Sequence, residues 1–291
     1  MANKKKKVDT RAIGLDIGLA FSRFLTGKEN LHYGLWDPKW DVCAENLGRA
    51  QEAYTAKLFK LLPKGRGLRI LDIGGGAGET AKKLLALGHQ VDIVIPSTFL
   101  AGRCRENAPA AHVHECMFED FKTEKTFDIC LFSESFQYIP LDQSLGKSQG
   151  LLAARGSVII ADCFRTDAFY AEKAASALVG GGHALSQFRP ALEASGLAVV
   201  SEEDITTAVA PSVDVEQALF NVLGHALTRV DHGISDGSPL LRKTLHKLVQ
   251  LFINKRTRDR LDQRLNHTDR NAQNFCRYNT YLMMKLAPRN S

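Results

Sequence analysis

Short apolar runs alternate with stretches of helical periodicity along the middle of the chain, and this alternation restricts the possible folds more than any other feature. The apolar runs occupy residues 68–73, 91–95, 111–117, 127–133, 156–164 and 197–205. The helical stretches between them occupy residues 79–88, 98–107, 141–155 and 185–196. Continuous apolar strands that alternate with helices are typical of a parallel sheet covered by helices on both faces. The pattern therefore predicts a three-layer α/β domain.

A long segment interrupts this pattern before the last apolar run, 279–288, which is expected to form a final strand. About 70 residues separate that run from the one ending near Ile205, which is too many for a structureless loop in a compact domain. Residues 213–230 and 239–265 have apolar positions at helical spacing. We therefore expect a helical insertion over residues 206–277.

Four glycines, at positions 74, 75, 76 and 78, fall within the short stretch RILDIGGGAGETAKKLL (69–85). Glycine loses more backbone entropy on folding than other residues, so such a cluster indicates a sharp turn or a close approach to a ligand. A loop of this kind between a strand and a helix can hold the pyrophosphate of a dinucleotide. Here Asp72 and Glu79 flank the glycines, and their charges would repel a pyrophosphate but suit a cationic ligand. The loop therefore predicts a site for a positively charged cofactor.

Four segments together resemble the class I S-adenosylmethionine-dependent methyltransferases. LDIGGGAGE (71–79) is similar to the first signature of that family. FDICLFSESFQYI (127–139) and LLAARGSVIIADCF (151–164) stand at the places of its fourth and fifth strands. HYGLW (32–36) is similar to the HYG-aromatic lid of many members that act on small molecules and lipids. The resemblance covers residues 30–205 and the final strand.

The resemblance implies a Rossmann-like fold with a mostly parallel, seven-stranded sheet and S-adenosyl-L-methionine as the cofactor. Residues 1–63 are then a basic tail and N-terminal lid helices, one of them over residues 41–63, and 64–205 form the core that binds the cofactor. Residues 206–277 are a substrate cap, and 278–291 hold the last strand. The cofactor-binding residues implied are Tyr33, Trp36, Asp72, Gly74, Gly75, Gly76, Gly78, Pro96, Met117, Phe118, Ser133 and Glu134.

Two positions depart from the family pattern in the half of the site that holds the nucleoside. The acid that usually ends the second strand and binds the ribose is replaced by Ile95, and Asp92 lies three residues too early. The acid that often binds the adenine amino group is replaced by Met117, followed by Phe118. Packing on these apolar side chains and Pro96, or polar groups from elsewhere, would have to hold the nucleoside.

Methyl transfer from a sulfonium is a direct displacement, so alignment and desolvation can supply most of the acceleration. A general base is needed only where the acceptor must lose a proton near neutral pH. The candidates for that base are Glu134, Tyr138, His32 and His225.

Positive charge is concentrated in two segments of the chain. The net charge of +6 divides into +4 for residues 1–12, +7 for residues 239–277 and −5 for the rest. Three interpretations of the second basic segment stay open: a cap with a solvated basic face, a surface that attracts acidic substrates or anionic lipid headgroups, and a nucleic-acid site. Interleaved aromatic residues, which would favour the third, are absent from its sequence.

The six cysteines are scattered without CxxC pairs, which favours free thiols in a reducing cytoplasm over a zinc site; no metal is expected. No apolar run approaches the roughly 20 residues that span a bilayer, so contact with a membrane would be peripheral at most.

The expected function is S-adenosylmethionine-dependent methylation of a small organic or lipid-like acceptor, without a nucleic-acid partner. The alternatives are an RNA or protein methyltransferase that uses the basic segment 239–277, and a non-catalytic module that binds the cofactor. The lid and the insertion would enclose a pocket suited to a small molecule. Apolar stripes of the insertion are expected to be buried as a roof over the methyl group: Val215, Leu219, Val222, Leu223, Leu227, Leu241, Leu245, Leu248 and Phe252.

Overall fold

The computed structural model describes residues 10–172, 179–252 and 254–289. Seven strands form one sheet in the order β3-β2-β1-β4-β5-β7-β6. The strands are β1 (Arg69–Ile73), β2 (Gln90–Val94), β3 (His112–His114), β4 (Phe127–Ser133), β5 (Leu152–Arg165), β6 (Leu197–Asp204) and β7 (Asn279–Pro288). β7 lies antiparallel between β5 and β6, and the other pairs are parallel. The predicted seven-stranded, mostly parallel sheet is confirmed.

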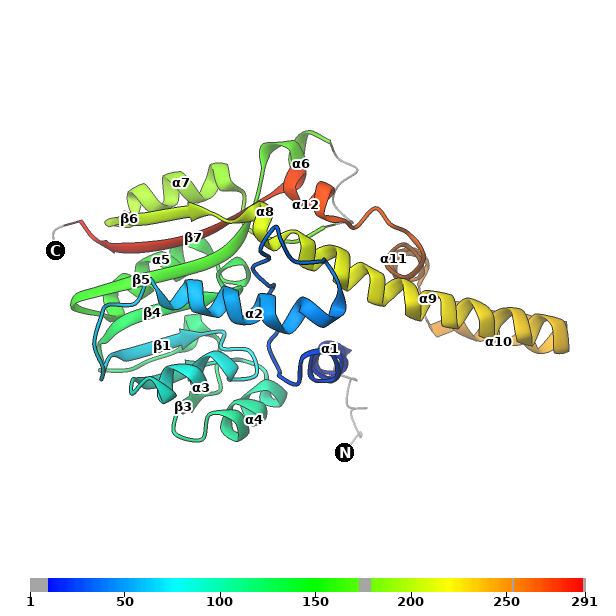
Figure 1. The fold of residues 1–291 in the computed structure, drawn as a ribbon, viewed down its shortest axis with the longest axis horizontal. Coiled ribbons are helices and arrows are strands. Elements are labelled where there is room, and N and C mark those ends of the chain that lie inside the picture. The colour runs from blue at the N-terminus through cyan, green and yellow to red at the C-terminus, as the bar shows by residue number, and fades with distance from the viewer. Residues whose placement is uncertain (1–9, 173–178, 253, 290–291) are drawn as a thin grey trace, which may run out of the picture.

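Helices cover both faces of the sheet, as the alternating pattern predicts (Figure 1). The helices before β6 are α1 (Thr10–Thr26), α2 (Ala44–Phe59), α3 (Glu79–Ala86), α4 (Thr98–Asn107), α5 (Leu141–Leu151), α6 (Asp167–Ala171) and α7 (Leu185–Ala194), with 3-10 turns at Phe118–Asp120 and Phe136–Tyr138; of these, the short α6 lies beside α12 (Ala272–Tyr278) rather than over the sheet. One buried cluster packs Tyr54 and Ala81 against one face, and a second packs Leu145 and Phe188 against the other. The three-layer α/β architecture is confirmed.

Two local predictions differ from the structure. The stretch 151–155 was expected to continue the preceding helix, but α5 ends at Leu151 and β5 begins at Leu152. The cause is pairing at the start of β5, where Leu152 lies opposite Phe127 of β4. The second difference is at α1: lid helices were expected in residues 1–63, but bounds were given only for the one over 41–63, and Leu19 on α1 is buried in the first core cluster.

The segment between β6 and β7 is helical, as expected. It contains α8 (Thr206–Val209), α9 (Pro211–Gly237), α10 (Pro239–Phe252), α11 (Lys255–Asn266) and α12 (Ala272–Tyr278). Its two ends belong to the core, since Val209, Val213 and Phe275 are each 0% exposed. The outer part of α9 and α10 project from the body as an arm, and α11 packs beside α9 (Figure 1).

The expectation that the apolar stripes of this segment are buried was wrong for most of the arm. Val215 is buried, but Val222 and Leu227 on α9 are 65% and 59% exposed, and Leu241 on α10 is 51% exposed. The reason is geometric, because α9 runs beyond the sheet and only its first turns have the core beneath them (Figure 1). Leu245 is also exposed, and the side chains of Leu248 and Phe252 lie outside the described residues.

Within the described ranges, no helix combines the length and apolar character that crossing a bilayer requires.

Candidate functional site

The glycine loop lies where β1 ends, next to the end of β4 on one side and β2 on the other. Gly74 has a φ of +76°, and a Cβ there would overlap the Cβ of Ser135. Gly76 has a φ of +56°, but the space beside it is open, since an added Cβ would meet only Leu31 Cδ1 at 3.9 Å. The loop is therefore packed tightly at its start and leaves Gly76 facing free space.

Asp72 lies beneath this loop with its carboxyl group buried. It is 1% exposed, and its Oδ2 has no hydrogen-bond partner among the described residues. A Cβ on Gly75 would lie 2.7 Å from that oxygen, so the glycine permits the close approach. Burial raises the pKa of Asp72 to about 7. A buried carboxyl group without a partner is expected to bind a cation that the protein alone does not supply.

Glu134 follows β4 and has a φ of +58°, the only positive φ of a non-glycine residue in the described part of the chain. Strained backbone of this kind is concentrated at functional sites. Its Oε1 accepts hydrogen bonds from the backbone N–H of Tyr33 at 2.8 Å and from the Tyr281 hydroxyl at 3.0 Å. Burial, with a smaller contribution from the charge of Asp162, raises the pKa of Glu134 to about 8. A carboxyl group of this kind can take up or release a proton near neutral pH.

The segment 29–36 crosses above the glycine loop and is fixed at its start by Glu29. The buried Glu29 carboxylate accepts hydrogen bonds from Arg103 at 2.7 and 3.0 Å and from Asn107 at 2.7 Å, and it also pairs with Arg23. These bonds join the segment to α4 and α1. They hold Leu31 and Tyr33 over the end of the sheet.

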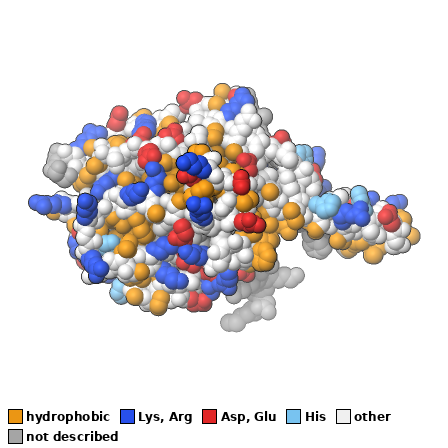
Figure 2. Space-filling model, in the orientation of Figure 1, with side chains coloured by type: hydrophobic (Ala, Val, Ile, Leu, Met, Phe, Trp, Pro, Cys, Tyr) orange, Lys and Arg blue, Asp and Glu red, His pale blue; other side chains and the backbone are white. Residues whose placement is uncertain are grey.

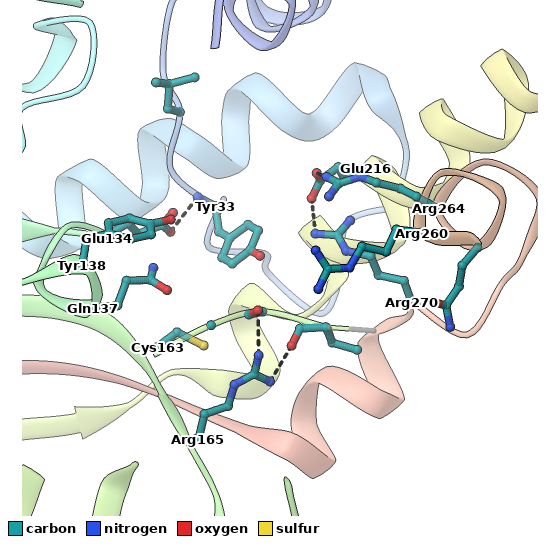
Figure 3. Close-up of a pocket in the computed structure, with 15 residues that line it drawn as sticks. Tyr33, Glu134, Gln137, Tyr138, Cys163, Arg165, Glu216, Arg260, Arg264 and Arg270 are labelled. Atoms are coloured by element: carbon teal, nitrogen blue, oxygen red, sulfur yellow. Dashed lines mark hydrogen bonds and ion pairs between the residues drawn. The ribbon is translucent and has the colours of Figure 1, made fainter. Parts of the chain in front are cut away.

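A cavity of about 550 Å³ opens next to Glu134 and Tyr33 (Figure 3). Its lining is Leu31, Tyr33, Glu134, Gln137, Tyr138, Cys163, Arg165, Val179, Gly180, Gly181, Glu216, Arg260, Gln263, Arg264 and Arg270. Four arginines and two glutamates are among these residues, so the cavity is polar and basic. The expected apolar roof is absent from this lining.

The structure brings only part of the predicted site to this cavity. Tyr33, Glu134 and the exposed Tyr138 line it. Trp36 is buried instead between α2 and α9, where its indole N–H donates to Ser212 Oγ at 2.9 Å. Ser133 lies beside the core, with its hydroxyl 3.1 Å from the Tyr54 hydroxyl.

Two of the candidate bases lie elsewhere. His32 stacks on Tyr54 with ring centroids 4.5 Å apart, and its Nδ1 lies 2.8 Å from the Tyr33 carbonyl oxygen. Burial lowers the pKa of His32 to about 4, so the ring is neutral at physiological pH. Its stacking on Tyr54 joins the segment 29–36 to α2. His225 is exposed on the outer part of α9 and does not line the cavity.

The residues expected near the nucleoside lie on β2 and in the segments that follow β2 and β3. The Asp92 carboxylate lies 2.7 Å from His114 Nε2 and 3.1 Å from Lys125 Nζ, which join β2 to β3 and to the loop before β4. Ile95 is buried, and Met117 is 44% exposed. Pro96 is also exposed.

Phe118 has a structural position, because it is 3% exposed and packs edge-on against Phe132 at 5.8 Å. Its side chain belongs to the second core cluster, together with Phe132.

Sequence reasoning missed the arginines of the cavity and Tyr281. Arg165 ends the apolar strand 156–164, where a charged residue gives a signal that could have marked the sheet edge. Arg260, Arg264 and Arg270 fall in the basic segment already noted, but their spacing does not show that they reach the sheet. Among the described residues, no group of three or more His, Cys, Asp or Glu side chains is placed to hold a metal ion.

The sequence and the fold can be compared with known proteins. Residues 71–160 match the family model described as a methyltransferase domain. No curated protein is similar enough in sequence to count as a relative.

Solved structures share the fold at low sequence identity. A cyclopropane synthase of Mycobacterium tuberculosis is 13% identical with a TM-score of 0.67, covering 98% of this chain and 100% of its own. The geranyl diphosphate C-methyltransferase of Streptomyces coelicolor A3(2), solved with Mg2+, geranyl-S-thiolodiphosphate and S-adenosyl-L-homocysteine, is 13% identical with a TM-score of 0.61, covering 94% and 92%. The [4+2]-cyclase SpnF is 13% identical with a TM-score of 0.64, covering 95% and 94%.

The matched residues run from β1 into β5, and so include the glycine loop, Asp72 and Glu134. The neighbours share the fold over nearly the whole chain, with the arm included in the alignment. Residues 71–160 therefore match a methyltransferase domain, and the chain as a whole shares the Rossmann-like fold of these solved structures.

Proposed function

We propose that the protein transfers the methyl group of S-adenosylmethionine to a small organic or lipid-like acceptor that enters the cavity beside Glu134. The observation that carries this proposal is the buried carboxyl of Asp72 beneath a glycine loop that faces free space. The family match over residues 71–160 supports the cofactor. Neighbours of the same fold methylate geranyl diphosphate or make cyclopropanes in lipids such as mycolic acid, which supports the class of acceptor.

The residues present fit S-adenosylmethionine. Asp72 would accept hydrogen bonds from its ammonium group, which provides the partner that Oδ2 lacks. Gly74, Gly75, Gly76 and Gly78 would let the backbone approach it closely. Pro96 and the exposed Met117 would contact the nucleoside. When bound, the cofactor supplies a methyl group already activated on a sulfonium.

The protein's own contribution to transfer is alignment, exclusion of water and control of one proton. Tyr33 and Leu31 line the cavity and would cover the bound cofactor. Glu134 lines the same cavity, and with a pKa of about 8 its carboxylate form can take a proton from a hydroxyl, amine or carbon acid. The Tyr281 hydroxyl and the Tyr33 N–H hold the carboxyl group in place. Tyr138 is a second lining residue that could orient the acceptor.

Calorimetry with S-adenosylmethionine and with S-adenosyl-L-homocysteine tests the cofactor site directly. We expect binding by the native chain and a loss of at least about tenfold in affinity for Asp72→Asn, equivalent to 1.4 kcal/mol. Asp236→Asn, an exposed carboxylate on the arm, is the matched control. Equal affinities in the two variants would exclude this site.

The proposal also includes the cellular location of the protein and its contact with membranes. The six cysteines are all free, which supports a reducing, cytoplasmic location. The arm exposes Leu240, Leu241 and Leu245 on the helix that also carries Lys243 and Lys247, a combination suited to peripheral contact with an anionic membrane surface (Figure 2).

A further inference from the structure

The four arginines of the cavity outnumber its acidic groups. Only Glu134 and Glu216 carry carboxyl groups in the lining, so positive charge remains in excess even when both are ionised. The arginines come from separate places: Arg165 from the end of β5, and the other three from α11 and the segment after it (Figure 3). Their convergence on one cavity is a product of the fold.

Arg165 is a buried cation without an acidic partner. It is 8% exposed, and its Nη1 and Nη2 donate to the carbonyl oxygens of Val179 at 2.6 Å and Gly180 at 2.8 Å. Its guanidinium stacks on Phe169 at 3.8 Å from the ring centroid. None of the carboxylates in the described part of the chain forms an ion pair with it. Burying a charge without a counter-charge is unfavourable, so a site of this kind favours an anion.

Arg264 and Arg270 share a single carboxylate. Glu216 Oε1 lies 2.6 Å from Arg264 Nη2, and Glu216 Oε2 lies 2.6 Å from Arg270 Nη2. The Nη1 of Arg270 is buried and has no hydrogen-bond partner among the described residues. One guanidinium donor in the cavity wall is thus left without an acceptor, which is rare in a folded protein.

Arg260, on α11, is the fourth cation of the cavity. It is exposed, lines the cavity and makes no ion pair with any described residue. Arg258 stands two positions earlier on the same helix but does not line the cavity. These two arginines therefore differ in their position relative to the cavity and offer a matched comparison.

We propose that this cavity binds a phosphate or diphosphate group of the methyl acceptor, held by Arg165, Arg260 and Arg270. Guanidinium groups bind such oxyanions through paired N–H donors, and several of them match a group with more than one negative charge. The organic part of the acceptor would then point towards Glu134 and Tyr33, which line the same cavity. That the bound anion is part of the methyl acceptor rests on the proposed function, whereas the anion site itself rests on the arginines alone.

Binding of inorganic pyrophosphate to the full chain, measured by calorimetry, tests the site. We expect the native protein to bind pyrophosphate, and Arg260→Gln and Arg270→Gln to weaken binding by about tenfold each, the effect of losing about 1.4 kcal/mol. Arg258→Gln removes the same charge from the same helix and should bind as the native protein does. Equal losses in Arg258→Gln and Arg260→Gln would mean general attraction to a basic surface and would overturn the proposal.

Glu216→Gln provides a change in the opposite direction. This substitution frees two guanidinium groups from their carboxylate, so pyrophosphate should bind more tightly than to the native chain. If the variant is less stable, added pyrophosphate should raise its melting temperature more than that of the native protein. Weaker binding by Glu216→Gln, or equally tight binding of hexanoate by the native protein, would contradict a phosphate site.

Cofactor binding by the same variants separates the two proposals. Arg260→Gln should bind S-adenosylmethionine normally, since Arg260 lines the cavity and none of the loop glycines does. If the native protein binds pyrophosphate but not S-adenosylmethionine, the proposed function fails and the anion site stands. If it binds S-adenosylmethionine but neither pyrophosphate nor hexanoate, the anion site is wrong and the proposed function is unaffected.

Discussion

The carboxyl group of Asp72, which we propose binds the cofactor, should make that binding depend on pH. With a pKa of about 7 in the free protein, Asp72 is largely protonated at pH 6 and largely ionised at pH 8. A cationic ligand binds the ionised form, so binding should release a proton near neutral pH. We expect the affinity for S-adenosylmethionine to rise about tenfold from pH 6 to pH 8, as one titrating group with this pKa requires. Calorimetry in buffers of different ionisation enthalpy measures both the affinity and the proton released.

Asp72→Asn should bind weakly at every pH and lose this dependence. A pH profile of equal slope in the native protein and in Asp72→Asn would assign the titration to another group.

Gly76 offers a test of the loop that separates ligand contact from folding. Gly76→Val places bulk in free space, so it should abolish cofactor binding while the core stays intact. A φ of +56° strains valine by about 1–2 kcal/mol. Gly67→Val is the control, because Gly67 has a φ of +78° and also faces open space, but lies outside the loop.

Thermal melts should show similar destabilisation in both glycine variants, and calorimetry should show lost binding in Gly76→Val alone. Normal binding by Gly76→Val would remove the loop from the cofactor site.

Among elements, the arm has no part in the cavity. Arg165 lies at the end of β5, and the other lining arginines and Glu216 lie on the first part of α9, on α11 and after it, all outside residues 227–249. Replacing residues 227–249 by a short glycine linker should therefore leave binding of S-adenosylmethionine unchanged. Sedimentation with vesicles containing phosphatidylglycerol should show that the shortened protein no longer binds them.

The double variant Leu240→Ser/Leu241→Ser, which keeps both helices, should weaken vesicle binding in the same direction. Loss of cofactor binding in the shortened protein would show that the arm supports the site.

The strands could be predicted from the sequence because each is a local pattern. All seven were placed, since buried parallel strands form continuous apolar runs bounded by turns. The glycine loop and Asp72 were predictable for the same reason. The exposed stripe of α10 was not, because an apolar face at helical spacing does not show what lies against it. The sequence also could not predict that Arg165 and Arg270 line the same cavity, since this depends on how the insertion returns to the sheet.

Over the whole molecule, buried carboxyl groups should make the free protein less stable as pH rises. Burial raises the pKa values of Asp72, Glu134 and Asp162 to about 7, 8 and 7, well above those of an unfolded chain. A raised folded-state pKa gives stability that is full at low pH and is lost as pH rises through that value. We expect the melting temperature of the free protein to fall between pH 6 and pH 9.

Glu134→Gln should flatten part of this decline in melting temperature, and Asp128→Asn, at a half-buried surface position, should not. If the melting temperature of the free protein instead rises from pH 6 to pH 9, the pKa values of these three carboxyl groups are not raised in the folded protein.

The position of β7 governs the order in which the sheet can be built. β1 to β5 can pair from neighbouring parts of the chain, but β7 must enter between β5 and β6, where Val158 meets Leu286 and Leu197 meets Pro288. Closing such distant pairs is slow because the loop entropy comes before the contacts. Until it happens, β5 has an open edge and β6 has no neighbour. Refolding should therefore pass through a species with a five-stranded sheet. The exposed edge of β5 is where a chaperone or a second unfolded chain would bind first.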